Sequence, residues 1–156
     1  MRSQFRPLIE SVAATRHLDP DLLEAQLLVE SSDDPHAFRW EPAFYQHYIK
    51  DKPQWASWGP LAACSYGLMQ LMGAVAIELG FSGPPQDLLV PNINLYFGVK
   101  KLAQLKSQCG GDIHAALCAY NGGLLGNDAP PYRNQGYLDK VLALRDTFPP
   151  PGSVHV

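Results

Sequence analysis

The stretch Leu22-Leu23-Glu24-Ala25-Gln26-Leu27-Leu28-Val29-Glu30-Ser31-Ser32 decides the fold of this chain, because a long apolar run ends there in a carboxylate and two serines. Directly before it, Asp19 can cap a helix and Pro20 suits a first helical turn. Asp21 and Glu24 add negative charge near the positive end of the helix dipole. We therefore predict a helix from about Pro20 to Glu30 or Ser32.

The position of Glu30 at the end of this apolar helix gives it a chemical meaning. A carboxyl group in such a place is poorly hydrated, so its charged form is disfavoured and its pKa is expected to rise. A carboxylic acid that stays protonated near neutral pH can donate a proton to a leaving oxygen. Glu30 is therefore a candidate general acid, against the alternative of a solvated residue at a helix end.

Apolar residues at helical spacing also occur elsewhere, and they predict a mainly α protein. Residues 33–64 are irregular, with four prolines, and only 43–50 look like one or two helical turns. We expect one globular helical domain over residues 1–148 and a mobile tail over 149–156. The predicted helices cover residues 5–13, 68–79 with Gly80 as the cap, 91–109, 112–121 with Asp112 as the cap, and 137–144.

The composition excludes several classes of protein. The 156 residues are 46% hydrophobic and 17% charged, which is typical of a folded domain. A net charge of −3 argues against nucleic-acid binding. No apolar run reaches membrane-spanning length, and residues 1–7 lack the apolar stretch of a signal peptide. We expect no membrane insertion and a monomer.

The cysteines and histidines show no pattern of a metal site. Cys64, Cys109 and Cys118 are odd in number and contain no close pair, so we expect reduced and mostly buried thiols. The five histidines are scattered without metal-ligand spacing. We therefore predict no metal and no cofactor.

Two further segments, Ser65-Tyr66-Gly67-Leu68-Met69-Gln70 and Ala119-Tyr120-Asn121-Gly122-Gly123, follow Glu30-Ser31 in the chain. In this order the three segments resemble the motifs of the lytic transglycosylases with a goose-type-lysozyme-like fold, which cleave the glycan of bacterial peptidoglycan. Pro91-Asn92-Ile93 and Gly136-Tyr137-Leu138 are similar to two other helices of that family. The resemblance covers about residues 18–144. It departs from the family at Gly73, where proline is usual, and in the long segment between Glu30 and Gly67, whose Phe38-Arg39-Trp40-Glu41-Pro42 resembles phage-type lysis enzymes.

The resemblance implies a lysozyme-like α+β fold with a substrate cleft, in which Glu30 acts as general acid and then as base. It also implies substrate-binding side chains, with Ser31 orienting the acid and Met69 packing against a sugar. Each assignment has a structural alternative: a core methionine, a surface amide at Gln70, packed tyrosine rings, or an asparagine that only ends a helix. The implied set is Ser31, Met69, Gln70, Tyr120, Asn121 and Tyr137.

The resemblance implies cleavage of the MurNAc-β-1,4-GlcNAc bond of peptidoglycan strands with formation of 1,6-anhydroMurNAc. The nearest alternative is a hydrolytic muramidase or chitinase, which needs a second carboxylate such as Glu41, Asp33 or Asp34. However, Glu41 lies beside Arg39 and is better explained as an ion pair, and the two aspartates precede Pro35 as in a turn. The alternative from another class is a non-catalytic glycan-binding or virion module.

The expected place of action is the bacterial cell wall in the periplasm, and the expected partner is the glycan strand. Because the chain starts without an apolar leader, delivery by phage lysis, by a virion, or after a trimmed export signal is expected. Trp40, Trp55 and Trp58 lie in the irregular segment, where they could line a sugar cleft or form a small hydrophobic core.

Overall fold

The computed structural model describes residues 1–150, 152 and 153. The chain divides into two compact units, of which one contains residues 1–29 and 102–156 and the other residues 30–101. Of the tail predicted over 149–156, residues 151 and 154–156 lie outside the described residues.

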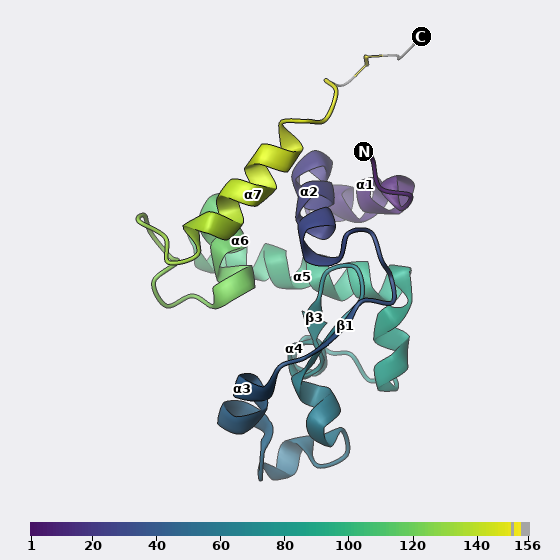
Figure 1. The fold of residues 1–156 in the computed structure, drawn as a ribbon, viewed down its shortest axis with the longest axis vertical. Helices are drawn as coiled ribbons and strands as arrows, with labels where there is room; N and C mark the ends of the chain where they lie inside the picture. The colour runs from purple at the N-terminus through teal and green to yellow at the C-terminus, as the bar shows by residue number, and fades with distance from the viewer. Residues whose placement is uncertain (151, 154–156) are drawn as a thin grey trace. The chain divides into compact units, whose positions relative to one another are not determined.

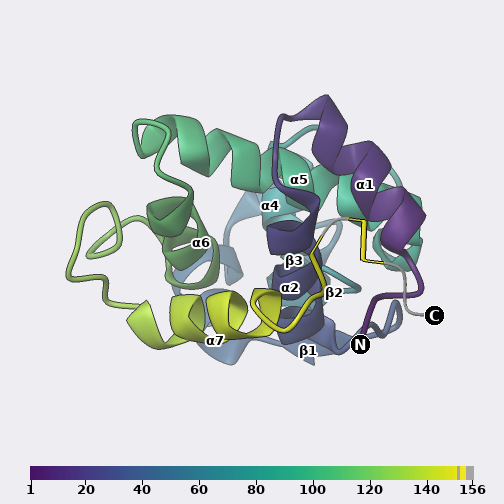
Figure 2. The same ribbon diagram turned by 90° about the horizontal axis from the view of Figure 1, so that it is seen from above.

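The first unit is helical, and the helices predicted for it are confirmed. It contains α1 (Arg6–Thr15), most of α2 (Pro20–Ser31), the end of α5 (Pro91–Gln108), α6 (Ile113–Gly122) and α7 (Gln135–Arg145). Both predicted caps form: the Asp21 N–H donates to Asp19 Oδ1 over 2.9 Å, and Asp112 Oδ1 accepts from the N–H groups of His114 and Ala115. Helices α6 and α7 pack side by side (Figure 2).

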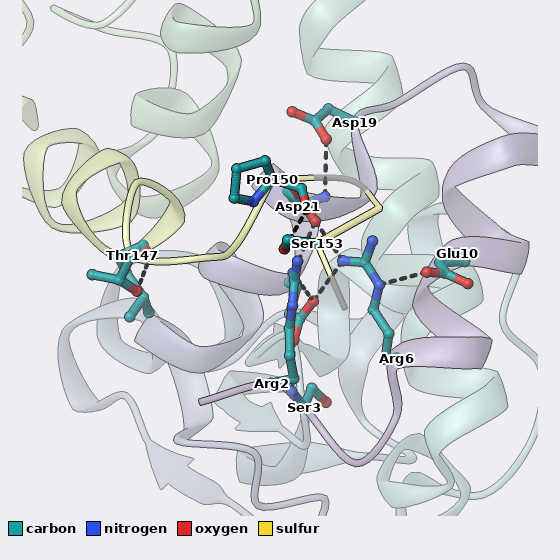
Figure 3. A network of polar contacts seen from close by, with 11 residues as sticks. Arg2, Ser3, Arg6, Glu10, Asp19, Asp21, Thr147, Pro150 and Ser153 are labelled. Atoms are coloured by element: carbon teal, nitrogen blue, oxygen red, sulfur yellow. Dashed lines mark hydrogen bonds and ion pairs between the residues drawn. The ribbon is translucent and has the colours of Figure 1, made fainter. Parts of the chain in front are cut away.

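A partly buried ion-pair network joins the N-terminal segment to α2 in this unit (Figure 3). Glu24 is completely buried, and its carboxylate accepts hydrogen bonds from Arg2 Nη1 at 2.9 Å and Arg6 Nη1 at 2.6 Å. The same arginines reach Asp21 at 2.9 and 2.7 Å and hold the pKa of that carboxyl below its usual value, against an opposing effect of burial. The interpretation of Glu24 as a residue that stabilises the helix dipole missed this network.

The second unit contains a small antiparallel sheet in the order β1 (Phe38–Trp40), β2 (Cys64–Tyr66) and β3 (Leu71–Met72). Phe38 pairs with Tyr66, and Ser65 pairs with Met72. The prediction of a helix over 68–79 is wrong in its first half, because residues 67–70 form a turn and only α4 (Gly73–Glu78) is helical. Gly67 and Gln70 have φ values of +67° and +47°, which a right-handed helix cannot accommodate.

The segment predicted to be irregular folds into short helical turns around a core of its own. They are α3 (Pro42–Phe44), the π-helical turn η1 (Tyr45–Ile49), and the 3₁₀ turns η2 (Pro53–Trp55) and η3 (Gly59–Ala63). Figure 1 shows the chain running from β1 directly into α3. Trp55 is buried in this core and Trp58 packs against it, whereas Trp40 is 43% exposed. Two of the three tryptophans therefore follow the hydrophobic-core alternative.

A third 3₁₀ turn, η4 (Pro85–Leu89), leads to the first half of α5, whose predicted start at Pro91 is confirmed. None of the three cysteines is paired: Cys64 and Cys118 are buried, and Cys109 is half-buried. Burial raises the pKa of the Cys64 and Cys118 thiols. In the described part of the chain, no helix combines the length and the apolar character needed to cross a bilayer.

Candidate active site

Glu30 is the penultimate residue of α2 and is half-buried. The helix ends one residue later because Ser32 and Asp33 have φ values of +53° and +67°. The Asp34 N–H donates to the carbonyl of Ser31 over 3.1 Å, and Asp34 Oδ1 accepts from the His36 N–H over 2.8 Å. The two aspartates therefore form the predicted turn, and this turn fixes where the chain leaves the acid.

Lys101 of α5 lies within electrostatic range of Glu30, a pairing that the sequence did not suggest. Burial lowers the pKa of Lys101 to about 8, although the attraction of the Glu30 carboxylate acts in the opposite direction. An ammonium group nearby favours the carboxylate form of an acid, whereas poor hydration favours the protonated form. The expected rise in the pKa of Glu30 stays a prediction, and Lys101 is the group that opposes it.

The second motif is a turn that Asn94 ties to α5. Asn94 is completely buried, and its Nδ2 donates to the carbonyls of Tyr66 at 2.7 Å and Leu88 at 2.8 Å. Its Oδ1 accepts from the Met69 N–H at 2.8 Å. One side chain thus binds the strand before the turn, the turn itself and the segment before α5, so the motif has a defined position on this helix.

Two glycines allow this close approach. A Cβ atom on Gly67 would lie 2.8 Å from Asn94 Nδ2, and the φ of Gly67 is left-handed as well. A Cβ atom on Gly98 would lie 2.8 Å from the Cβ and Cγ atoms of Met69. The Met69 side chain is completely buried at this contact. Its burial favours the packing alternative over contact with a sugar.

Gln70 stands at the end of the turn, and its side-chain amide is held by backbone carbonyls. Nε2 donates to Gly67 O over 3.0 Å and to Ala37 O over 3.2 Å. The Gly67 N–H also donates to Ala37 O, over 2.7 Å. Gln70 is therefore a fixed, half-buried group that connects the turn to the segment before β1, and the surface-amide alternative is disfavoured.

The third motif lies in the other unit, at the end of α6. Tyr120 is only 5% exposed, whereas Asn121 is exposed and its Oδ1 accepts from Asn134 Nδ2 over 2.7 Å. Asn134 also exchanges two hydrogen bonds with the buried Asn127, at 2.8 and 2.9 Å. Arg133 donates to the carbonyl of Gly122. Asn121 therefore holds the turn after α6, which was one of its two expected roles.

The remaining candidate residues are placed as follows. Tyr137 is half-buried on α7, in the same unit as Tyr120. Glu41 is paired with Arg39 at 3.3 Å, which agrees with the ion-pair interpretation. Glu30, Met69 and Gln70 belong to residues 30–101, and the convergence of Tyr120 on Glu30 stays a prediction.

Residues 7–140 match the family model described as the transglycosylase SLT domain. The chain belongs to this family. Two solved structures share the fold of this SLT domain: an inactive mutant of the lytic transglycosylase Slt from Pseudomonas aeruginosa and the 70 kDa soluble lytic transglycosylase from Escherichia coli. Their TM-scores are 0.67 and 0.64, their identities 22% and 21%, and they cover 91% and 90% of this chain. The chain spans 23% of the length of each.

Three residues that organise the motifs of this SLT domain were not found from the sequence: Asn94, Lys101 and Asn134. One signal was present for Asn94, which precedes Gly98 by one helical turn on a mostly apolar face of α5. A polar residue in such a position must find partners when it is buried. The other two residues carried no comparable signal, because lysine and asparagine are common at exposed positions.

Proposed function

We propose that this chain is a peptidoglycan lytic transglycosylase that cleaves the MurNAc-β-1,4-GlcNAc bond with Glu30 as its general acid and base. The observation that carries this proposal is the family match over residues 7–140, which contains all three motifs in order. The name of the Pseudomonas relative supports it, since that inactive mutant carries glutamine in place of a glutamate.

In the proposed reaction, the protonated Glu30 gives its proton to the leaving O4 as the bond from C1 to O4 breaks. The 6-hydroxyl of the same muramoyl residue then forms a bond to C1, and the Glu30 carboxylate takes up the hydroxyl proton. Glu30 thus returns to its starting state, and no water is consumed. Because the attacking hydroxyl is already part of the reacting sugar, its effective concentration is high and no separate site for water is needed.

Lys101 supports the second stage of this cycle. Its ammonium group stabilises Glu30 while Glu30 is a carboxylate, which is the form that must take the proton of the 6-hydroxyl. Ser31, Gln70, Tyr120, Asn121 and Tyr137 are proposed to orient the acid or to line the substrate site, and Met69 to support the turn from inside.

The rival muramidase mechanism needs a second carboxylate to activate water. Glu41 is the first candidate, but its carboxylate is paired with Arg39 at 3.3 Å. Asp34 is occupied by the turn after α2, where it accepts from the His36 N–H. These contacts favour the transglycosylase.

We further propose that the protein acts as a monomer on the glycan strands of the cell wall, in the periplasm, without metal or cofactor.

The test is product analysis of purified peptidoglycan by mass spectrometry. Anhydro ends are lighter than reducing ends by one water, and wild type should release only the lighter fragments. Glu30→Gln, folded as judged by circular dichroism, serves as the matched control for contaminating activity. Release of ordinary reducing muramic acid would identify a hydrolase, and the absence of any fragment would leave the non-catalytic module.

A further inference from the structure

A cavity of about 290 Å³ lies in the segment between β1 and β2, away from the three motifs in the sequence. Its walls include Tyr45, Ile49 and Trp55, and Asp51 and Lys52 also line it. Ile49 and Trp55 are buried and belong to the core of this segment, so this side of the cavity is built on rigid packing.

The backbone around the cavity has an unusual geometry. Tyr45–Ile49 form a π-helical turn that ends with the Lys50 N–H donating to the Tyr45 carbonyl over 2.8 Å. Asp51 follows with a φ of +60°, which places it in the left-handed region. Single π-helical turns and left-handed non-glycine residues are costly, and they occur preferentially at functional sites. Here they bring Tyr45, Asp51 and Lys52 to one cavity.

Aromatic side chains lead from the sheet to the cavity. Phe38 and Trp40 are 52% and 43% exposed, and they share a face of β1 because they are two residues apart. The ring of Trp40 contacts that of Tyr45, with centroids 5.3 Å apart. One ring contact therefore connects the exposed strand with the cavity wall.

We propose that this cavity is a second carbohydrate-binding site, which takes one neutral pyranose ring of a peptidoglycan strand. This inference rests on the proposed function for the identity of the polymer. The lining carries one negative and one positive side chain, so it favours a neutral polar ligand over an ionic one. The volume lies at the lower end of the range for ligand sites and suits a single sugar ring. Aromatic rings offer flat apolar faces, and Asp51 and Lys52 supply an acceptor and donors for hydroxyl and acetamido groups.

The segment that forms this cavity lies between the first and second motifs, where the resemblance to the family departs from its shortest members. A site there gives the domain a second contact with an insoluble polymer. Two linked contacts raise the effective concentration of the strand at the enzyme, without changing the chemistry at Glu30.

The test measures binding without turnover, in a Glu30→Gln background, by co-sedimentation with purified cell walls and with glycan strands freed of peptide by an amidase. Tyr45→Leu keeps an apolar side chain but removes the ring and hydroxyl, and Lys52→Gln removes a charged donor. Each change should weaken binding to both polymers about fivefold. Lys50→Gln is the matched control. It also removes a lysine charge, two residues before Lys52, but the Lys50 side chain does not line the cavity.

Equal binding by the Glu30→Gln protein with and without Lys52→Gln, both folded, would overturn the proposal. So would a loss of binding confined to walls that still carry peptides, because that would identify a peptide site. The Trp55 indole N–H should shift in an NMR titration with N-acetylglucosamine oligomers, and no shift would count against the site. These readouts do not depend on lytic activity, and the anhydro product of wild type tests the proposed function separately.

Discussion

Asn94 offers the sharpest test of how the second motif is held. Asn94→Ala removes three hydrogen bonds and leaves the Met69 N–H and the carbonyls of Tyr66 and Leu88 without this partner, all in a buried setting. An unsatisfied buried group costs about 1–3 kcal/mol. Three such groups, with some relaxation, should lower the free energy of unfolding by about 3–6 kcal/mol, a large part of the 5–15 kcal/mol typical of a domain.

The measurement is urea and thermal unfolding of wild type and Asn94→Ala, followed by circular dichroism. For a domain of this size, 1 kcal/mol corresponds to about 2–4 °C, so the Tm should fall by about 6–24 °C. Asn92→Ala is the control, because it makes the same change at an exposed position on the same helix and should stay within about 0.5 kcal/mol of wild type. Lytic activity should be lost in Asn94→Ala well below its Tm.

A second substitution separates hydrogen bonding from packing. Asn94→Asp keeps the shape and the acceptor for Met69 but turns an oxygen toward two carbonyls. Its destabilisation should be close to that of Asn94→Ala at pH 7 and smaller at acidic pH, where the protonated acid can donate to one carbonyl. If Asn94→Ala unfolds within 1 kcal/mol of the Asn92→Ala control, the reasoning is wrong.

Four further changes test other parts of the structure. Glu30→Gln should lower cleavage of cell walls by at least ~10²-fold with unchanged unfolding, and near wild-type turnover would refute its role as the acid. Gly98→Ala brings a methyl group to 2.8 Å from the methionine of the second motif and should reduce kcat in a turbidity assay, while the exposed Gly136→Ala should not. The pKa of Lys101 is lowered from 10.5 to about 8, so the unfolded chain binds more protons than the folded chain between these pH values. The free energy of unfolding should therefore rise with pH in this range, by up to ~3 kcal/mol. This pH dependence should vanish in Lys101→Met, and its persistence would exclude Lys101 as the cause. Glu24→Gln weakens two charge-assisted hydrogen bonds, although both arginines keep Asp21 as a partner, and should cost about 1–3 kcal/mol in unfolding experiments, unlike Glu10→Gln at an exposed pair.

The helices could be predicted because their signals are local. Asp19 and Asp112 cap helices through hydrogen bonds to residues two or three positions later, so the capping residue and its partner are visible in one short window. The apolar spacing in α5 and α7 likewise needs no knowledge of distant residues.

The errors arose where distant contacts decide the structure. The strands of the sheet have only two or three residues, too few to show alternation, and β1 pairs with β2 across more than twenty residues of intervening chain. Leu68, Leu71 and Val75 are spaced as in a helix, yet the left-handed Gly67 and Gln70 turn this stretch back on itself. Similarly, nothing near Glu24 indicates that two arginines from the N-terminal segment will surround it.

In the candidate site, the motif residues could be named from the sequence, but their directions could not. Met69 and Gln70 are neighbours in one motif, and the turn buries the first side chain against Gly98 while the second spans two backbone carbonyls. Backbone conformation determines which of two adjacent side chains faces inward, and here that conformation depends on Asn94.

The contacts of the Gln70 side chain decide whether it can donate or accept a hydrogen bond to a ligand. A glutamine amide has two N–H groups, and those of Gln70 already donate to Ala37 and Gly67. Only its carbonyl oxygen remains to meet a ligand, so Gln70 can read a hydroxyl or an amide N–H of a sugar but not a carbonyl. In the proposed function, the folded chain would thereby fix the sense of the hydrogen bond before a glycan binds, and an acetamido group would have to present its N–H, not its oxygen, to this residue.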